Sequence, residues 1–593
     1  MKGTTAVLCA CIFLVFFRLA ASKTHKHPVS TYFHRKNADG TLVDRSSLKY
    51  EEIFKTIFIE KISELDASTA SISANPHNDV ENGEDVVISW KNVIKPSYMD
   101  WIGLFCPQSD NATRPLDYFH VTDSREKLSW ERGYGSKTVK LFNMRSSCEL
   151  RYYRSVDGGD YAALVARSSS ITFKGRSDVP QHGHLSLTND PSEMRVMWIS
   201  GNGDSPVVWF GTSKDKLSKQ ADATTKTYKR EDMCAFPANS IVAFRDPGLI
   251  HDSLLTGLQP GVTYYYRFGS AKMMSPVYNF TTALPAGDPT PHKFIVYGDM
   301  GIDALLSPGG QETANRIVEE YRENNIRHVF HNGDISYAVG FAYLWDQWMS
   351  AIEPYSTLVP YMVGIGNHEQ DHISGGSKDP SGAPGEGYHP KWGNYGKDSG
   401  GECGVPMYYR FHMPDNGHYL WWYSYDFGLV HFIMMSTEHN FEPGSRQYEW
   451  LENDLKKVDR KKTPWVLIGG HRAMYASQDE YDDYIVSVNM QRLFEDLLYK
   501  YKVDLALWAH YHSYERTCKV YRNRCAEDGI TNVVIGTAGR FLDLELFMHK
   551  DWSVTRLKEY GYGRVTVFNH TTMHFEFIRN KDKVVRDSFY LHR

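Results

Sequence analysis

The pattern of hydrophobic and polar positions divides the chain into regions of different character. Residues 23–75 are mostly polar, and only 48–66 shows a helix-like apolar rhythm. After Asp85 the pattern changes to short apolar runs of strand type, which Gly, Pro and Asn turns separate. The runs cover residues 85–90, 100–105, 150–156, 184–188, 194–200, 206–211 and 263–269. They predict two β-sandwich modules, over residues 76–175 and 176–285.

A proline-rich connector over residues 283–291 separates these modules from a region with a different pattern. Strand-like runs are found there at 293–297, 327–331, 361–365, 430–435, 465–468 and 503–508, and helical stretches near 312–323, 447–458 and 489–501. This alternation predicts βαβ architecture in an α/β domain over residues 290–593. A glycine-rich stretch over 373–404 is too long for an ordinary connector, and it is either a lid over a site or an insertion.

The N-terminus has the composition of a secretory signal peptide over residues 1–22. Lys2 precedes an apolar run over 6–17, and small residues follow at 20–22. A membrane anchor is the alternative, but the run is shorter than the roughly 20 residues that span a bilayer. Sequons for N-glycosylation start at Asn111, Asn279 and Asn569. We therefore expect a secreted, extracellular glycoprotein, and the cell wall or the vacuole stays open as its final location.

The cysteines agree with an oxidising compartment. Cys9 and Cys11 would leave with the signal peptide, and the remaining six are even in number, which favours disulfides. A zinc site is the rival interpretation, but no Cys-x-x-Cys pair occurs. The spacing suggests one disulfide within a hairpin and one within a β module, and it leaves the partners of Cys234 and Cys403 open. The two suggested pairs are Cys518 with Cys525 and Cys106 with Cys148.

Length and charge set the outer limits of the interpretation. A chain of 593 residues is too long for one hydrophobic core, so two to four domains are expected. Aromatic residues at 14% against 23% charged residues indicate a folded, β-rich chain. The net charge of -5 provides no overall basic field for nucleic acid or anionic lipid. We therefore expect neither a nucleic acid nor a membrane as partner.

Five short polar motifs follow strand-like runs of the C-terminal domain. In an open α/β sheet the carboxyl ends of the strands meet at one edge, which would bring the motifs together. They supply carboxylate, phenol, amide and imidazole groups, which hard, highly charged metal ions prefer, and two ions roughly 3.5–4 Å apart can clamp the reacting oxygens of a phosphate. The motifs are Gly298-Asp299-Met300-Gly301, Gly333-Asp334-Ile335-Ser336-Tyr337, Gly366-Asn367-His368-Glu369, Gly469-Gly470-His471-Arg472 and His510-Tyr511-His512.

With these motifs the chain resembles the purple acid phosphatases, in particular the large plant-type group with extra N-terminal β modules. The resemblance covers roughly residues 80–593, including 392–395 and 561–564. It implies a multidomain fold in which N-terminal β-sandwich modules, Ig-like and fibronectin type III-like, precede an α/β four-layer metallophosphoesterase (calcineurin-like) domain with a C-terminal segment of the family. It also implies a binuclear metal centre.

Tyr337 is the residue that indicates the metal. Ordinary calcineurin-like metallophosphoesterases use Asp-x-His as their first motif, whereas Gly301 occupies that His position here. Tyr337 matches the Gly-Asp-x-x-Tyr motif, whose phenolate binds ferric iron in purple acid phosphatases. The resemblance thus implies Fe(III) in site one and one divalent metal, Zn, Mn or Fe, in site two. Carried over, site one would be Asp299, Asp334, Tyr337 and His512, and site two would be Asp334, Asn367, His471 and His510.

The expected nucleophile is a hydroxide, because a bound metal lowers the pKa of water from about 15.7 to about 7 even when the metal is zinc. The resemblance makes His368 the candidate proton donor to the leaving alkoxide, with an orienting role as the alternative. Asn367 and His368 are candidate substrate contacts. Arg472 and His439 are further candidates, but both residues can equally be structural hydrogen-bond donors. Well-known plant members carry substrate-contacting histidines in the region that corresponds to residues 479–483, and this chain has none there. The acidic cluster over residues 480–483 is most simply a solvated surface patch.

These observations predict a secreted binuclear-metal acid phosphatase that hydrolyses monoesters of phosphorylated small molecules. A phosphodiesterase or nucleotide pyrophosphatase on the same metal centre is the alternative. An inert β-module binding protein is a third interpretation, but such a protein would be expected to have lost a ligand, and all seven are present. The chain has neither the phosphate loop of NTPases nor the His-Glu-x-x-His motif of zincin proteases. The natural substrate, the divalent ion and the formation of a homodimer stay open.

Overall fold

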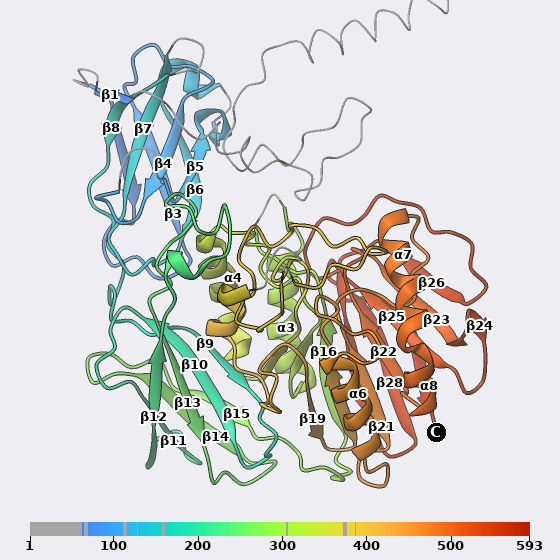
Figure 1. The fold of residues 1–593 in the computed structure, drawn as a ribbon. Helices are drawn as coiled ribbons and strands as arrows, with labels where there is room; N and C mark the ends of the chain where they lie inside the picture. Colours follow the sequence, from blue (N-terminus) through green and yellow to red (C-terminus); the bar gives the residue numbers. More distant parts are fainter. Residues whose placement is uncertain are drawn as a thin grey trace, which may run out of the picture. The chain divides into compact units, whose positions relative to one another are not determined.

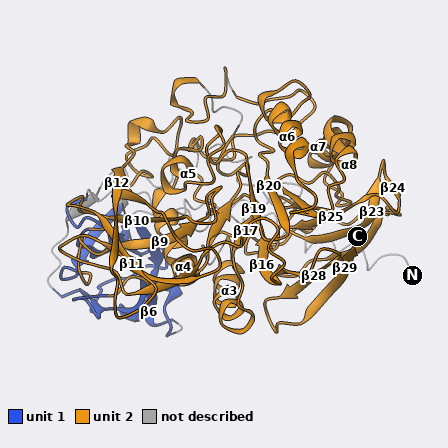
Figure 2. Cartoon of the chain, turned by 90° about the horizontal axis from the view of Figure 1, so that it is seen from below, with its two compact units in different colours: residues 1–80, 84–141, 146–172 blue, residues 81–83, 142–145, 173–593 orange. Residues whose placement is uncertain are grey.

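The structure is a computed structural model that describes residues 62–64, 69–110, 115–126, 128–156, 161–303, 306–371, 376–385 and 387–593. The predicted signal peptide, most of the predicted 23–75 extension and Asn111 lie outside the described residues. The chain divides into two compact units, which Figure 2 shows in different colours. The first comprises residues 1–80, 84–141 and 146–172, and the second comprises residues 81–83, 142–145 and 173–593. The second unit therefore holds both the second predicted β module and the predicted α/β domain.

The first unit contains a β-sandwich built from a five-stranded and a three-stranded sheet. Strand β3 shows the alternation that produces it, since Val86, Ile88 and Trp90 are buried while their neighbours are more exposed. Trp101 stacks on Tyr153 in the core, with ring centroids 4.3 Å apart. The larger sheet has the order β1 (Ile62–Glu64), β8 (Tyr161–Arg167), β7 (Glu149–Val156), β4 (Trp101–Phe105), β5 (Asp117–His120), and the smaller has the order β2 (Ser71–Asn75), β3 (Glu84–Lys91), β6 (Gly135–Leu141). Strands β1 and β2 precede residue 76, the expected start of this module.

The second β module opens the second unit and is entirely antiparallel. Its strands follow the order β15 (Tyr278–Thr281), β14 (Thr263–Gly269), β11 (Val207–Gly211), β12 (Lys219–Lys226), β13 (Leu249–Leu255), β10 (Met194–Ser200), β9 (Gln181–Ser186). The apolar runs predicted four of these strands, namely β9, β10, β11 and β14. Strand β12 escaped prediction because its sequence, KQADATTK, has no large apolar residue and is mostly exposed.

The α/β domain contains two sheets. One has the order β18 (Tyr361–Val363), β17 (Val329–His331), β16 (His292–Tyr297), β27 (Gly561–Val567), β28 (Thr572–Arg579), β29 (Val585–His592). The other has the order β19 (Tyr423–Phe427), β20 (Val430–Met434), β21 (Trp465–Gly469), β22 (Leu505–Trp508), β25 (Ile530–Ile535), β23 (Tyr514–Tyr521), β24 (Arg524–Cys525), and β26 (Ser553–Leu557) pairs with β23. Strands β16, β17 and β18 are mutually parallel, as are β20, β21, β22 and β25. Their carboxyl ends provide the edges on which a site can form.

Helices cover the outer faces of the two sheets (Figure 1). Between the sheets, Phe294 of β16 meets Phe432 of β20 edge to face, with ring centroids 5.0 Å apart. On one outer face, Tyr297 of β16 hydrogen-bonds through its hydroxyl to Tyr355 of a helix at 3.0 Å. On the other, helical residues share an apolar cluster with Ile433, Ile468 and Trp508 of the second sheet. These contacts give four layers, as the fold class predicts.

The helices on the first outer face are α3 (Gly310–Asn324) and α4 (Ala342–Ser356). Those on the second are α6 (Arg446–Lys457), α7 (Tyr481–Met490) and α8 (Asp496–Lys500), and a π-helical segment η8 (Gln491–Glu495) joins α7 to α8. Helix α4 was not predicted from the sequence. Its residues Leu344, Trp345 and Trp348 are all buried, so the helix lacks the polar face that would make its periodicity visible. Short elements complete the fold: α5 (Val405–Arg410), η3 (Val121–Asp123), η4 (Ser129–Arg132), η6 (Arg230–Asp232) and η7 (Gly376–Lys378).

Three disulfides join the six cysteines that follow the predicted signal peptide. Cys106 pairs with Cys148 and Cys518 pairs with Cys525, as expected. The third disulfide joins Cys234 of the second β module to Cys403 of the α/β domain, a pairing that the sequence left open. Within the described part of the chain, no helix has both the length and the hydrophobicity needed to cross a membrane.

Candidate metal centre

Each of the five motifs begins at the carboxyl end of a strand of the α/β domain or a few residues beyond it. Asp299 follows β16, Asp334 follows β17, and His510 follows β22. The backbone of these three residues and of Tyr337 is left-handed, with φ values of 59°, 50°, 72° and 52° in the order Asp299, Asp334, His510, Tyr337. Non-glycine residues adopt this conformation rarely, and such strain concentrates at functional sites. The backbone at these four residues therefore makes sharp turns that direct their side chains toward a common position.

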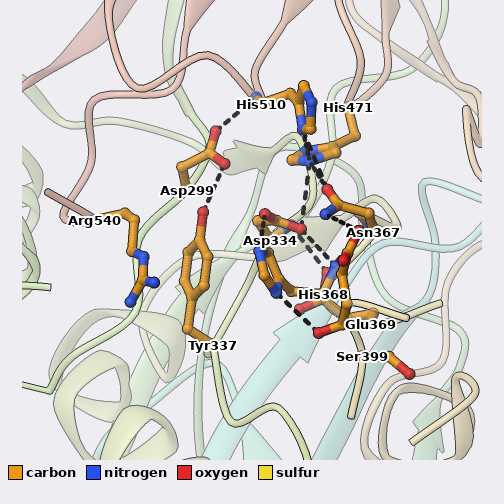
Figure 3. Close-up of polar contacts among 12 residues, drawn as sticks. Asp299, Asp334, Tyr337, Asn367, His368, Glu369, Ser399, His471, His510 and Arg540 are labelled. Carbon is orange, nitrogen blue, oxygen red and sulfur yellow. Dashed lines mark hydrogen bonds and ion pairs between the residues drawn. The ribbon is translucent and has the colours of Figure 1, made fainter. Parts of the chain in front are cut away.

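Asp299, Tyr337 and His512 form a first donor group. Figure 3 shows Tyr337 pointing toward Asp299. The Tyr337 hydroxyl donates to Asp299 Oδ1 at 2.8 Å and lies 2.9 Å from His512 Nε2. His512 Nε2 lies 3.4 Å from Asp299 Oδ1. The guanidinium of Arg540 covers the Tyr337 ring, 4.6 Å from its centroid. Two oxygen donors and one nitrogen donor thus converge in a buried position.

Asn367, His471 and His510 form a second donor group beside the first. Asn367 Oδ1 lies 2.9 Å from His471 Nε2 and 3.1 Å from His510 Nδ1. The two imidazole nitrogens lie 3.2 Å apart. This group therefore presents one amide oxygen and two ring nitrogens to a common point.

Asp334 connects the two donor groups. Its Oδ1 lies 3.3 Å from His471 Nε2, and Asp299, Asp334 and His471 each offer a ligand atom within 4.8 Å of the others. The loop that carries Asp334 packs tightly on the next motif, since a Cβ on Gly366 would lie 2.1 Å from Asp334 Oδ1. Glu369 fastens the same loops by accepting the backbone N–H groups of Asp334, Ile335 and Gly366 at 2.9, 2.8 and 3.1 Å. Asp334 is thus held in position to serve both groups.

The second ring nitrogen of each histidine faces an acceptor of the protein. His471 Nδ1 donates to the Asn332 carbonyl at 3.0 Å, and His512 Nδ1 donates to the Phe541 carbonyl at 2.9 Å. His510 Nε2 lies 3.1 Å from Asp483 Oδ1. Such contacts fix the ring tautomer and leave the other nitrogen with a lone pair, as histidines that ligate metals require.

The charges of the centre fit cations. Burial alone would raise the pKa of Asp334, but His471 and His368 lower this pKa well below its ordinary value. Burial would lower the pKa of His471, but Asp334 raises it to about 9. Asp543 and Asp299 likewise raise the pKa of His512 well above its usual range, against the effect of burial. The carboxylates that favour a proton on these rings would also favour a metal cation in place of that proton. The donor atoms of the centre are oxygen and nitrogen only.

His368 lies at the margin of the donor groups. Its Nδ1 donates to the Asp398 carbonyl at 3.0 Å, and its Nε2 lies 3.7 Å from Asp334 Oδ2. Its ring centroid is 4.6 Å from that of Tyr337. The imidazole is therefore held beside the centre without joining either donor group.

Comparisons with known proteins agree with this geometry. The model of the purple acid phosphatase N-terminal domain matches residues 180–282, that of the calcineurin-like phosphoesterases matches 292–514, and that of the iron/zinc purple acid phosphatase-like protein C matches 529–588. The "Probable inactive purple acid phosphatase 9" of Arabidopsis thaliana is 34% identical over 571 residues, which cover 88% of this chain and 85% of that protein. The chain belongs to the purple acid phosphatase family.

Two further relatives of this purple acid phosphatase chain are informative. A solved structure of a purple acid phosphatase from yellow lupin (Lupinus luteus) seeds is 30% identical and superposes with a TM-score of 0.77 over 88% of this chain and 96% of that one. A "Nucleotide pyrophosphatase/phosphodiesterase" of Hordeum vulgare is 33% identical, and the match covers 53% of this chain and 87% of that protein. The family and the fold class that the sequence indicated are thereby confirmed.

The side chains of Arg472 and His439 have hydrogen-bond partners other than the seven expected ligands. Buried Arg472 donates through Nε to Glu438 at 2.9 Å and through Nη1 to Asp483 at 3.2 Å. His439 Nδ1 lies 2.7 Å from Ser436 Oγ. Among the described residues, neither side chain hydrogen-bonds to an expected ligand. Their positions favour the structural role that the sequence left open.

The acidic cluster over residues 480–483 is only partly a solvated surface. Asp483 is buried and pairs with Arg472 and His510, so the expectation of a solvated cluster is wrong for this residue. The reason is tertiary, because Arg472 and His510 supply the opposite charge and the hydrogen bonds that a buried carboxylate needs. Burial and the charges of Asp483 and Asp543 raise the pKa of nearby Glu480 to about 9.

Sequence reasoning missed four carboxylates that support the expected ligands. Glu369 was visible as the last residue of its motif, but its role depends on the folded loops. Asp398 and Asp543 lie in segments without a motif, so no local signal marked them, and Asp483 was interpreted as part of a solvated patch. Asp543 accepts the backbone N–H of His512 at 2.7 Å. Of the sequon asparagines, Asn569 is exposed and Asn279 is half-buried, and both stay predicted glycosylation sites.

Proposed function

We propose that this purple acid phosphatase chain is an active, secreted acid phosphatase that hydrolyses phosphate monoesters of small molecules. The observation that supports the proposal is the convergence of the other six expected ligand side chains on the two sides of Asp334. Loss of activity through loss of metal would be expected to remove at least one of these donors. The name of the Arabidopsis relative includes "probable inactive", so the activity has to be measured on this chain.

We infer that the two donor groups hold different ions. Asp299, Tyr337, His512 and Asp334 would hold Fe(III), because carboxylates and a phenolate suit a trivalent ion. Asn367, His471 and His510 would hold a divalent ion, Zn, Mn or Fe, together with Asp334. When bound, two such ions supply Lewis acidity to the phosphoryl oxygens and lower the pKa of water.

The protein's own groups would orient the substrate and move a proton. The Asp398 carbonyl fixes the hydrogen of His368 on Nδ1, so Nε2 is the atom that faces the centre. In its doubly protonated form, the His368 ring would keep the Nδ1 hydrogen bond and deliver the proton on Nε2 to the departing alkoxide. Asn367, the neighbour of His368 in the sequence, would contact the substrate phosphate through its side-chain amide, on the side of the second donor group. Arg472 and His439 have no part in this proposal.

A phosphodiesterase or nucleotide pyrophosphatase activity is the second candidate. It is supported by the name of the Hordeum vulgare relative, whose match covers 53% of this chain. The same seven donors would serve either reaction. The ratio of turnover on a phosphate monoester to turnover on a diester, measured at acidic pH, separates the two candidates.

Secretion and glycosylation form a separate part of the proposal. Three disulfides and an exposed sequon at Asn569 support passage through an oxidising compartment. We expect the protein to appear in the culture medium and to lose mass on treatment with an N-glycosidase. Retention of the protein inside the cell without glycan would contradict this part of the proposal and would not bear on the proposed phosphatase activity.

The experiment that tests the activity combines spectroscopy, metal analysis and mutation. We expect a visible tyrosinate-to-iron band, two metal ions per chain, and hydrolysis of monoesters in acid. His368→Ala should lower turnover about 10²–10⁴-fold and leave metal content unchanged. His549→Ala is the matched control, since His549 is 89% exposed. A colourless protein, or equal losses of metal and turnover in His368→Ala, would contradict the proposal.

A further inference from the structure

A short segment of the glycine-rich stretch contacts two residues of the centre at once. Asp398, which is 7% exposed, accepts the Asn367 Nδ2–H group through Oδ2 at 2.9 Å. The backbone carbonyl of the same residue accepts the His368 Nδ1–H group at 3.0 Å. One residue thus contacts both the expected ligand of the second donor group and the candidate proton donor.

The contact with Asn367 decides which end of its amide faces the donor group. An ionised carboxylate only accepts hydrogen bonds, so Asp398 selects the amide nitrogen. The oxygen Oδ1 is then left to face His471 Nε2 at 2.9 Å and His510 Nδ1 at 3.1 Å. With the amide turned around, N–H groups would point at the position where a cation is expected. The orientation of Asn367 therefore depends on Asp398.

The segment that carries Asp398 is fastened to the second β module. Gly401 O accepts the backbone N–H groups of Cys234 at 3.0 Å and Ala235 at 3.3 Å, and Gly400 O accepts that of Ala238 at 3.1 Å. The Cys234–Cys403 disulfide adds a covalent link. The approach is so close that a Cβ on Gly401 would lie 2.4 Å from Ala235 O. The module thus holds the segment by both its backbone and a disulfide.

Other contacts tie the same segment to the loops of the centre. Ser399 donates through Oγ to Asp371 Oδ2 at 2.6 Å, and its backbone N–H reaches the same oxygen at 3.2 Å. Glu402 accepts the Gly340 N–H at 3.0 Å and the Trp345 Nε1–H at 3.1 Å. The segment therefore contacts the β module on one side and the loops that carry Tyr337 and Asn367 on the other.

We propose that Asp398 is a positioning residue that sets the orientation of Asn367 and His368, and that the second β module keeps it in place through residues 400–401 and the Cys234–Cys403 disulfide. The β module then forms part of the machinery that builds the divalent-metal site. The consequence for metal binding rests on the proposed metal centre, and the consequence for catalysis rests in addition on the proposed phosphatase activity. The first donor group has other supports, Arg540 and Asp543, so the effect should be confined to the second.

Asp398→Ala in the full-length, metal-loaded protein tests the role of the side chain. We expect affinity for the divalent ion, measured by titration with a chelator, to fall about 10–100-fold. The visible band that reports Tyr337 should keep its intensity, which a general loss of structure would not allow. Asp398→Asn conserves volume and one acceptor oxygen and should give a smaller loss, so it decides the question if the alanine variant does not fold. Asp415→Ala, at an exposed aspartate, is the matched control.

The double variant Cys234→Ser with Cys403→Ser tests the role of the β module. Its control is Cys518→Ser with Cys525→Ser, which also removes one disulfide but far from Asp398 in sequence. We expect only the first variant to lose divalent-metal affinity and kcat, with KM nearly unchanged. Equal metal retention in the two double variants would overturn the role of the module, and unchanged affinity in Asp398→Ala would overturn the role of Asp398.

The outcomes of this test are separable from those of the proposed function. A wild-type protein that binds two ions but hydrolyses no phosphoester would refute the proposed function. The chelator titrations of the variants would still give their answer in that case. Conversely, an active enzyme whose Asp398→Ala variant keeps its divalent ion would refute only the positioning role.

Discussion

The two donor groups differ in charge, and the difference indicates what each can hold. The first group contributes the Asp299 carboxylate and the Tyr337 phenol, which becomes anionic when it binds a metal. The second contributes an amide and two imidazoles, all neutral as ligands. Because Asp334 lies between the groups, the first can offer three negative charges and the second only one. A trivalent and a divalent ion would each meet a donor set of suited charge.

The two groups also differ in how the fold supports them. The first is supported from the C-terminal part of the chain, by Arg540 and Asp543. The second is supported by Asp398, from the segment between β18 and α5, and by Asp483, from the first turn of α7. Asp398 and Asp483 thus come from two separate regions of the chain, whereas Arg540 and Asp543 lie in one short segment between β25 and β26. We therefore expect changes in either of these two regions to weaken the divalent site.

Removing Asp334, the ligand that the two groups share, should weaken metal binding in both groups alike. Asp334→Ala is expected to lower the metal content of both sites and to reduce turnover by about 10³-fold or more, because the donors act as a unit. Metal analysis and monoester hydrolysis check this outcome. The exposed Asp482→Ala serves as control. Retention of one full equivalent of metal in Asp334→Ala would show that the groups are independent.

Removing the phenol should affect the first group alone. Tyr337→Phe is expected to eliminate the visible band and to lower turnover about 10²-fold, while the divalent ion stays bound. The absorption spectrum and the metal content of the same sample provide the measurement. Tyr481→Phe, at a side chain that is 74% exposed, is the control. A band of unchanged intensity would exclude Tyr337 as the iron ligand.

Weakening a support of the second group should affect the divalent ion alone. Asp483→Asn removes the charge that faces His510 Nε2 at 3.1 Å and is expected to weaken divalent-metal binding about 10–100-fold. The visible band should persist. Asp482→Asn, at the exposed neighbour on the same helix, should change neither property. If Asp483→Asn bleached the colour as well, the supports of the two groups would not be separate.

The smallest effect is expected from pH in the metal-free protein. His471 has its pKa raised to about 9, above the unfolded value of about 6.5. Its protonated ring therefore contributes stability that is fully present below about pH 6.5 and is lost as the pH rises through about 9. The Tm of the metal-free protein should fall over this range, whereas the metal-loaded protein, with a neutral ring, should not follow. Parallel Tm profiles for the two forms would contradict this origin of the shift.

Much of the fold could be predicted because its signals are local. The apolar runs that became β16, β20, β21 and β22 are continuous, buried and short, and all except β20 lead into a motif. Helix α6 was visible through its apolar stripe, since Leu451 and Leu455 lie on one face. Helix α7 begins earlier than predicted, because its first turn carries Asp482 and Asp483 and shows no apolar period. Elements or element ends without such a local pattern were not predicted.

By itself, the sequence determined the order of the modules, the family and the seven expected ligands, because each motif is a contiguous run whose chemistry can be read directly. Only the tertiary structure decided that Cys234 pairs with Cys403, that Asp483 is buried beside His510, and that Asp398 holds Asn367. These contacts join residues far apart in the chain. Their partners are chosen by packing and by the need of buried polar groups for hydrogen bonds, and no local pattern records that choice.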